Sequence, residues 1–110
     1  MAKAKRPPKA KAPEPEPAPR PPLTPSTTKQ FERDVARMRK RGQDTDRLRT
    51  AIVLLCSRLP LPRQLADHPL QGEWKSFRDC HLATDWVLIY QTTETELILA
   101  RTGSHSDLFG

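Results

Sequence analysis

The sequence predicts an α+β fold: a two-helix hairpin packed on a small antiparallel β-sheet, preceded by a disordered tail. Three observations predict it. Prolines crowd the first 25 residues, apolar residues recur at helical spacing over residues 26–63, and they alternate beyond residue 72. Nine of the 12 prolines lie in residues 1–25, where Met1 and Leu23 are the only large apolar side chains. So little apolar surface cannot offset the entropy of ordering a chain. We therefore expect a disordered, basic, proline-rich tail over 1–25 and one domain over 26–110.

Two amphipathic helices are expected next. The first should start with Thr24 as its N-cap and Pro25 at its first helical position, and should end at Arg41 and Gly42. Its apolar side chains follow helical spacing: Phe31, Val35 and Met38. The second should start at Asp44 and run to the prolines at positions 60 and 62. Its apolar side chains are Leu48, Ile52, Leu55 and Leu59.

Three strands should follow the helices, because the apolar period changes to two after residue 72. We expect them over residues 74–82, 85–91 and 96–102. The short polar connections between them imply antiparallel pairing. Residues 86–90 are apolar at every position, so the middle strand should be central, with helices on one face and aromatic or ligand contacts on part of the other.

The charge distribution points to an anionic partner. The chain has 19 Lys and Arg against 13 Asp and Glu, a net charge of +6. Ten cations against four carboxylates give +6 over residues 26–63, whereas three against seven give −4 over 64–110. A basic surface of this kind favours nucleic acid or an acidic protein. No apolar run approaches the roughly 20 residues of a membrane span, so we expect no membrane partner.

The cysteines and glycines indicate no cofactor. Cys56 and Cys80 form neither a C-x-x-C motif nor part of a four-ligand zinc site, so we expect reduced thiols in a cytoplasmic protein. The tail has no apolar segment of a secretory signal. The four glycines form no phosphate-binding loop, so no nucleotide cofactor is expected.

The three histidines are the first candidates for chemistry. His68, His81 and His105 all lie in the last 43 residues, next to the ends of the expected strands, and should converge on one rim. Their spacings of 13 and 24 residues match no common zinc motif, so we favour a metal-free acid/base site. Each histidine taken alone is also explained as an ordinary surface or capping residue.

Carboxylates and cations accompany the histidines. Asp79, His81 and Asp85 surround one turn, and a carboxylate beside an imidazole raises its pKa and fixes its tautomer. A surface ion pair is the alternative interpretation. A scissile phosphate needs cations, which the expected strands supply: Lys75, Arg78 and Arg101. Surface solvation explains any one of these equally well.

Two aromatic residues recur at even spacing on the expected middle strand. A nucleic-acid base can stack on Trp86 or Tyr90. Core packing is the stronger expectation for Tyr90, and the two alternatives stay open for Trp86.

Four sequence blocks follow one another in the C-terminal half: DHPLQGEW at 67–74, FRDCH at 77–81, DWVLIY at 85–90 and RTGSHSDLFG at 101–110. On these blocks the chain closely resembles the YafQ branch of the RelE/ParE superfamily of bacterial toxin–antitoxin toxins, over about residues 26–110. The resemblance implies a compact α+β fold. It also implies a ribosome-dependent, metal-independent endoribonuclease that cuts mRNA in the ribosomal A site and is silenced by a cognate antitoxin.

The resemblance also implies roles for particular residues. Acid/base chemistry falls to His68, His81, Asp85 and His105. Phe109 would position the substrate, and Asp79 would be a supporting carboxylate. Trp86 and Arg78 would contact the ribosome or mRNA. The RNA 2′-hydroxyl would attack the adjacent phosphorus, with one histidine or Asp85 as base, another histidine as acid, and Arg78 or Lys75 steadying the charge.

The partners follow from the resemblance and the charges together. The basic helices, including Arg37 and Arg41, should bring the protein to ribosomal RNA, and charge reversal of those two residues should leave the fold intact. The antitoxin should present an acidic segment that folds on contact.

The sequence departs from the family where the family's first strand would lie. That place holds Arg20, Leu23, Thr24 and three prolines, which lack the N–H that a sheet needs, so we expect the strand to be missing or frayed. Two alternative functions remain: a ParE-like gyrase inhibitor with no nuclease site, and a small basic RNA-binding module.

Overall fold

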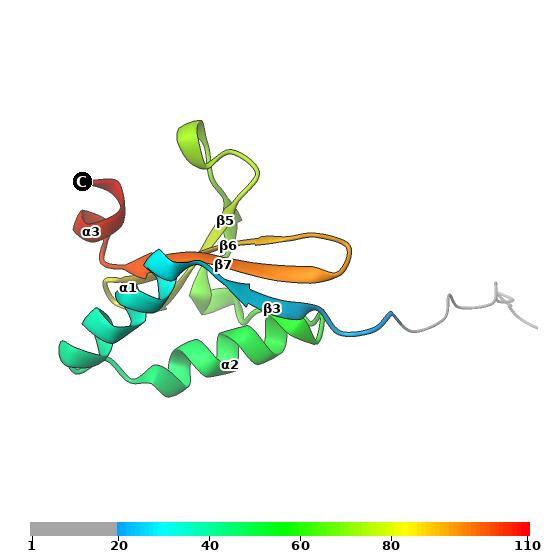
Figure 1. The fold of residues 1–110 in the computed structure, drawn as a ribbon, viewed down its shortest axis with the longest axis horizontal. Coiled ribbons are helices and arrows are strands. Elements are labelled where there is room, and N and C mark those ends of the chain that lie inside the picture. The colour runs from blue at the N-terminus through cyan, green and yellow to red at the C-terminus, as the bar shows by residue number, and fades with distance from the viewer. Residues whose placement is uncertain (1–19) are drawn as a thin grey trace, which may run out of the picture.

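The computed structural model describes residues 20–110 of the chain, so most of the expected tail, residues 1–19, lies outside the described residues. The elements follow one another along the chain in Figure 1: β3 (Thr24–Thr27), α1 (Lys29–Lys40), α2 (Thr45–Cys56), β4 (His68–Pro69), β5 (Arg78–Ala83), β6 (Trp86–Thr92), β7 (Glu96–Gly103) and α3 (His105–Phe109). Two 3₁₀ turns, Arg63–Leu65 and Gly72–Trp74, lie between α2 and β5. The mixed α+β fold agrees with the sequence prediction.

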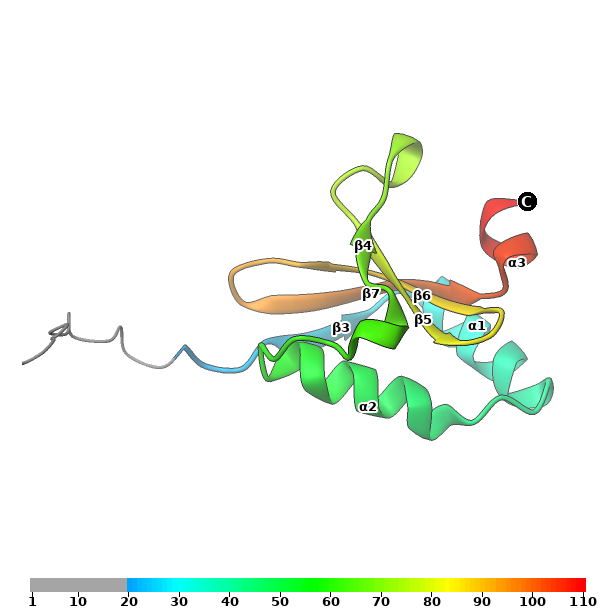
Figure 2. The same cartoon turned by 180° about the vertical axis from the view of Figure 1, so that it is seen from behind.

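The sheet has five strands in the order β3-β7-β6-β5-β4, which Figure 2 shows from behind. β5, β6 and β7 pair antiparallel, as predicted, and β4, a strand that was not predicted, pairs antiparallel with β5. β3 instead runs parallel to β7, so the sheet is mixed rather than purely antiparallel. β6 lies at its centre, and all of residues 86–90 are buried, which confirms the predicted central strand.

The segment expected to open the first helix is strand β3. α1 begins after it, with Thr28 as N-cap, whose hydroxyl oxygen accepts from the Phe31 amide at 2.9 Å. The amides of Thr24 and Thr28 donate toward the β7 side, to carbonyls of residues 95 and 99. Successive amides point to opposite sides of a strand, so the N–H that Pro25 lacks would have faced outward. The expectation of a missing or frayed strand is therefore wrong, because an edge strand tolerates proline on its outer side.

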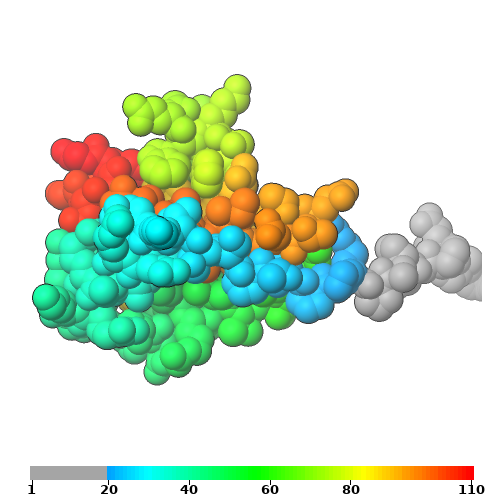
Figure 3. All heavy atoms as spheres, in the orientation of Figure 1, coloured from blue at the N-terminus to red at the C-terminus, as the bar shows by residue number. Residues whose placement is uncertain are grey.

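Apolar cores lie on both faces of the sheet. On one face, Trp86, Leu88 and Tyr90 of β6 pack with α1 and α2. On the other, Val87 and Ile89 pack with Leu108 of α3 and with partly buried side chains of the loop before β5: Leu70, Trp74 and Phe77. Figures 1 and 3 show α1 and α2 on the lower side and the loop and α3 on the upper side. The period of two along β6 thus divides its side chains between two cores.

The sequence prediction is confirmed at two of the four helix termini, and the other two differ for local reasons. Arg41 caps the C-terminus of α1, and Gly42 follows with φ 90°. Asp44 caps α2 through the Asp46 amide at 2.9 Å. The N-terminus of α1 is the correction given above. The other end of α2 also differs, because the chain turns left-handed at Arg58, with φ 62°. Leu59 is therefore outside the helix and 53% exposed.

The predicted first strand begins four residues late. Gly72–Trp74 forms a 3₁₀ turn, and β5 starts only at Arg78. Leu23 is 5% exposed and the sheet begins at Thr24, so ordered structure starts before residue 26.

Cys56 and Cys80 are free thiols, and burial raises the pKa of Cys80 to about 12. No helix within residues 20–110 combines the length and apolarity needed to cross a membrane.

Candidate functional site

The three histidines lie in a row on the face of the sheet that carries α3. His68 comes from β4, His81 from β5 and His105 from the first position of α3. The ring centroids of His68 and His81 are 6.2 Å apart, and those of His81 and His105 are 5.4 Å apart. Phe109 extends the row, its ring 6.1 Å from that of His105. Residues spread over 42 positions thus form one site.

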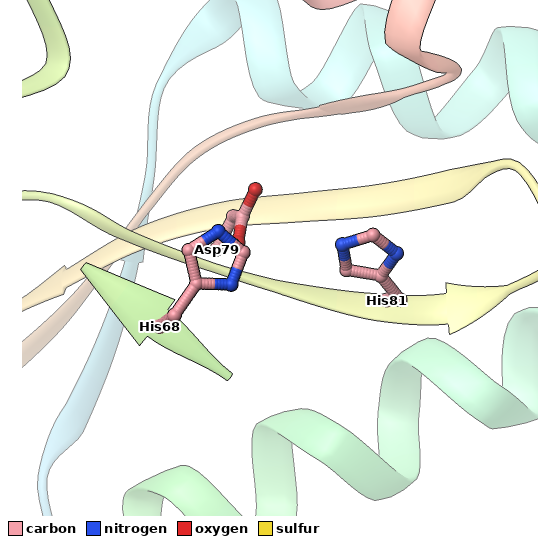
Figure 4. Close-up of side chains that lie close together, drawn as sticks. All are labelled: His68, Asp79 and His81. Carbon is pink, nitrogen blue, oxygen red and sulfur yellow. The ribbon is translucent and has the colours of Figure 1, made fainter. Parts of the chain in front are cut away.

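Strand register explains this placement. His68 pairs with Asp79 across β4 and β5, and His81 pairs with Val87 across β5 and β6. Asp79 and His81 are two positions apart, so they share a face. It is the face of Val87 and Ile89. Figure 4 shows the His68 ring beside the Asp79 carboxylate, with His81 farther along β5.

Asp85 fixes the orientation of His105. Its Oδ1 accepts from the His105 backbone N–H at 3.0 Å and lies 2.8 Å from Nδ1 of the same residue. The backbone hydrogen bond, followed by the ring hydrogen bond, lowers the pKa of Asp85. An ionised carboxylate can only accept, so Nδ1 carries the proton and Nε2 has a free lone pair. His105 and Asp85 are both more than half exposed, so Nε2 is open to a substrate.

His68 is oriented by a carbonyl and faces a buried carboxyl group. Its Nδ1 lies 2.8 Å from the Ala66 carbonyl oxygen, which can only accept, so Nδ1 carries a proton. Its Nε2 lies 3.1 Å from Oδ1 of Asp79. That oxygen is buried and makes no hydrogen bond of good geometry, so the contact is better described as an ion pair. Burial raises the pKa of Asp79, and the charges of nearby histidines partly offset this rise. The Nε2–Oδ1 contact is attractive only when a proton resides on one of the two groups.

His81 occupies the centre of the row and is half-buried. Among the residues that the structure describes, no hydrogen bond holds its ring. Either nitrogen can therefore meet a substrate. This differs from His68 and His105, in which a partner already fixes one nitrogen.

His68, Asp79 and His81 together meet the geometric requirement for a metal site. One ligand atom from each lies within 4.8 Å of the others. Two imidazoles and a carboxylate form a donor set that binds Zn²⁺ or Cu²⁺. The sequence spacing did not reveal this set, because strand pairing rather than chain proximity brings His68 to Asp79.

The predicted substrate cations are largely engaged elsewhere. Arg78 makes a bidentate pair with Asp67, both contacts at 3.2 Å, and the Tyr90 hydroxyl donates to the same carboxylate. Arg101 pairs with the buried Asp34 at 2.6 Å. Lys75 is exposed in the turn after Gly72–Trp74 and is not on a strand. Neither arginine is thus a free cation at the histidine row.

The aromatic residues of β6 belong to the core. Trp86 is fully buried, and its indole Nε1 donates to the Thr102 hydroxyl at 2.8 Å. No face of the ring is open to a base or to ribosomal RNA, which corrects the contact inferred from the resemblance. Tyr90 is 2% exposed, as expected for core packing. Phe109, in contrast, is 45% exposed beside His105.

A buried charge network was missed by the sequence analysis. Asp34 is fully buried and accepts from Arg37, Arg101 and the Thr102 amide. Burial alone would raise its pKa, but hydrogen bonds, that from Arg101 foremost, lower it overall. The available signal was a charged residue between Phe31 and Met38 on the apolar face of α1.

Two basic residues assigned to ribosomal RNA belong to the same region. Arg37 pairs with Asp34 at 3.0 Å, and Arg41 pairs with Asp107 at 2.7 Å. Reversing the charge of both would place carboxylates against carboxylates. We therefore expect the double reversal to destabilise the fold, contrary to the expectation from the sequence.

Comparison with known proteins identifies the family of the chain. Residues 23–110 match a family model described as "Bacterial toxin of type II toxin-antitoxin system, YafQ". The chain belongs to the YafQ toxin family. It is 46% identical over 82 residues to the mRNA interferase toxin YafQ of Escherichia coli strain K12, covering 74% of this chain and 89% of that protein. A putative toxin YafQ of Haemophilus influenzae is 49% identical over 73 residues, covering 64% of this chain and 72% of the relative.

Solved YafQ structures share the fold. The crystal structure of YafQ from Escherichia coli BL21(DE3) superposes with a TM-score of 0.76 at 42% identity, covering 80% of this chain and 99% of that one. YafQ in a DinJ-YafQ toxin–antitoxin complex gives a TM-score of 0.74 at 43% identity, with 80% and 98% covered. A metal-bound toxin from Helicobacter pylori gives 0.74 at 43% identity, with 79% and 99% covered.

Proposed function

We propose that this YafQ-family toxin is an endoribonuclease that cleaves mRNA in the ribosomal A site and thereby inhibits translation. The row of three imidazoles, with Nε2 of His105 free and directed by Asp85, is the observation that carries the proposal. Proton-transfer groups close together on an open surface suit a substrate presented by a larger particle. The Escherichia coli relative is named an mRNA interferase, which supports this activity.

The chemistry needs two proton transfers. As the RNA 2′-hydroxyl attacks the adjacent phosphorus, a base takes its proton, and an acid protonates the departing 5′-oxygen. The P–O5′ bond breaks, leaving a 2′,3′-cyclic phosphate and a 5′-hydroxyl. His81 and His105, with ring centroids 5.4 Å apart, are the pair best placed for these roles. Asp85 is engaged twice by His105, so it orients that ring rather than acting as the base.

The remaining residues support binding and charge. Protonated His68, next in the row, can stabilise the phosphorane charge. Phe109 offers an exposed ring beside His105, on which a nucleotide base can stack. No step requires a metal ion, so we infer a metal-independent reaction in which the His68–Asp79–His81 donor set acts through protons.

The biological setting follows from the family. We infer that a cognate antitoxin with an acidic segment covers the basic surface and that the protein acts in the cytoplasm on translating ribosomes. The structural likeness to YafQ in its complex with DinJ supports an antitoxin partner. We also infer that α1 and α2 on the sheet form the RelE-like arrangement of ribosome-dependent toxins.

The test is cleavage of a defined mRNA on purified ribosomes, with 5′ ends mapped by primer extension. We expect cuts at the A-site codon, a new 5′-hydroxyl end, and no cutting of the same mRNA without ribosomes. Inhibition of DNA supercoiling by gyrase without mRNA cleavage would favour the ParE-like alternative. Ribosome binding without either activity would favour the RNA-binding module.

A further inference from the structure

The position of His105 depends on a helix too short to be stable alone. α3 has five residues, with His105 first and Phe109 last. An isolated helix of this length does not form in water. Contacts outside α3 must therefore determine where these two rings lie.

Asp107 makes contacts in two directions from the middle of α3. It forms a capping box with Ser104, accepting from the Ser104 amide at 2.9 Å while its own amide donates to the Ser104 hydroxyl at 3.1 Å. It also accepts two hydrogen bonds from Arg41, at 2.7 and 3.2 Å. Arg41 caps the far end of α1, 66 residues away in the chain. One carboxylate thus closes the first turn of α3 and joins it to α1.

The junction between β7 and α3 is closely packed around the same carboxylate. A Cβ on Gly103 would lie 2.9 Å from Cβ of Asp107 and 3.0 Å from Nη2 of Arg37. Arg37 approaches Asp107 at 3.7 Å and also holds the fully buried Asp34 at 3.0 Å. Figure 3 shows α3, in red, above the cyan surface of α1. Only glycine allows this approach, so the contact with α1 is part of how the chain turns into α3.

α3 has two other attachments to the rest of the fold, one apolar and one polar. Leu108 packs against the sheet beside Val87 and Ile89. Asp85 holds His105, but both side chains are more than half exposed. The Arg41 hydrogen bond, followed by that from the Ser104 amide, keeps the pKa of Asp107 well below its usual range. The pair is therefore fully charged at neutral pH.

We propose that Arg41 and Asp107 are positioning residues that fix α3 against the end of α1 and thereby hold His105 and Phe109 in place for the reaction. The inference rests on the proposed nuclease function for its kinetic consequence. Neither residue touches the histidine row, so the pair acts through α3 and not on the substrate.

The kinetic test uses Arg41→Gln, Asp107→Asn and the double variant. The matched control is Arg49→Gln, which removes the same charge and an exposed Arg49–Asp46 contact of 2.7 Å on α2. We expect each single variant to lower kcat by about 10- to 100-fold, the effect of a small misplacement of a reacting group, with KM for mRNA on ribosomes equal to that of the control. The double variant should be no slower than the slower single variant.

Two kinetic outcomes would overturn the proposal. If Arg41→Gln had the same kcat as Arg49→Gln, Arg41 would contribute only its positive charge and would not position α3. Losses that multiply in the double variant would show that the two residues act independently.

Amide hydrogen exchange tests the structural part without mRNA cleavage. The amides of Leu108 and Gly110 donate within α3, to carbonyls of Ser104 and Ser106. In Arg41→Gln they should exchange faster than in the wild type, while amides of β6 stay protected. Unchanged exchange in α3, or a loss of protection throughout the sheet, would overturn the proposal. A wild-type protein that cleaves no mRNA on ribosomes would overturn the proposed function instead, and the exchange result would still decide whether the pair holds α3.

Discussion

At the scale of single residues, hydrogen-bond partners decide which imidazole nitrogen can react. The carboxylate of Asp85 holds the proton on Nδ1 of His105, and the Ala66 carbonyl does the same for His68. Nε2 is therefore the reactive atom in both. In His105 it opens to solvent, whereas in His68 it faces the buried Asp79. The neighbouring groups thus make Nε2 of His105 available to a substrate and place Nε2 of His68 against a carboxyl group.

Removing the free imidazole should abolish most of the activity without unfolding the protein. His105→Ala should lower kcat by roughly 10²–10⁴, the usual contribution of one proton-transfer group. Its melting temperature should stay near that of the wild type, because the side chain is 51% exposed. Ribosome cleavage assays and thermal unfolding check the two parts. Cleavage at the wild-type rate would remove His105 from the mechanism.

Divalent metal should inhibit rather than activate. Zn²⁺ or Cu²⁺ bound by His68, Asp79 and His81 would occupy the lone pair that His81 needs as a base or acid. Cleavage should fall when Zn²⁺ is titrated in and recover when a chelator selective for Zn²⁺ over Mg²⁺ is added, and His68→Ala should require more Zn²⁺ for the same inhibition. If protein stripped of Zn²⁺ and Cu²⁺ were inactive and regained cleavage when either ion was restored, the metal-independent mechanism would be wrong.

At the scale of elements, local signals predicted what local interactions determine. The cap at Asp44, the end of α1 at Gly42 and the buried run of β6 were all visible in the sequence, because each depends on near neighbours or on apolar pattern. β4 has two residues and α3 has five, too few for any period to show. Pairing with β7 determines β3, despite its proline.

The residues of the candidate site also differ in whether local or distant interactions determine their surroundings. Grouping of His81 with Asp79 and Asp85 follows from strand alternation and one turn, so the sequence indicated it. The partners of Arg78 and Arg101 are Asp67 and Asp34, 11 and 67 positions away. Nothing local marks those pairings, so two structural arginines were interpreted as substrate cations.

The buried carboxylate of α1 should be essential for stability. Asp34→Ala leaves Arg37 and Arg101 without their partner and the Thr102 amide without its acceptor. We expect a loss of about 3 kcal/mol in the free energy of unfolding, at the lower end for broken buried pairs because both arginines partly reach solvent. Urea unfolding measures it. The control is Asp46→Ala, an exposed partner of Arg49, which should cost less than about 1 kcal/mol. Equal losses in the two variants would contradict the prediction.

Acid should weaken the same region. The folded-state pKa values of Asp34 and Asp107 lie below the ordinary value, so their stabilisation is complete above about pH 4 and is lost as the pH falls further. Burial raises the pKa of Asp79, so protonation of this carboxyl group at low pH stabilises the folded state instead. Asp107→Asn should therefore lose less stability between about pH 4 and pH 2 than the wild type. If the free energy of unfolding fell equally with pH in Asp107→Asn and in the wild type, the prediction would be contradicted.

At the scale of the whole molecule, α1 carries a group of exposed cations on its outer face. A hollow of about 510 Å³ is lined there by Arg33, Arg37, Arg39 and Lys40, with Ala36 between them. Arg37 is engaged with Asp34, but the other three cations are exposed. This face points away from the sheet, so it can meet phosphates without disturbing the core.

Charge reversal on this face should weaken ribosome binding selectively. Arg33→Glu combined with Lys40→Glu should lower the affinity and flatten its dependence on salt, because fewer counterions are released. Sedimentation with ribosomes across a salt series measures both. Arg63→Glu, on the 3₁₀ turn before β4, is the control for net charge and should have a smaller effect. Affinity that stays constant between low and moderate salt would contradict the electrostatic basis.

The two outer strands of the sheet have a further consequence for how the protein behaves when it is overproduced. β3 and β4 are the edges, and each contains a proline, Pro25 and Pro69. The neighbouring amides of Thr24 and Leu70 donate inward, so both prolines leave a donor missing on the outer side. A foreign strand that approaches either edge meets an interrupted ladder. The sheet is thereby protected against growing into amyloid-like stacks from chain to chain.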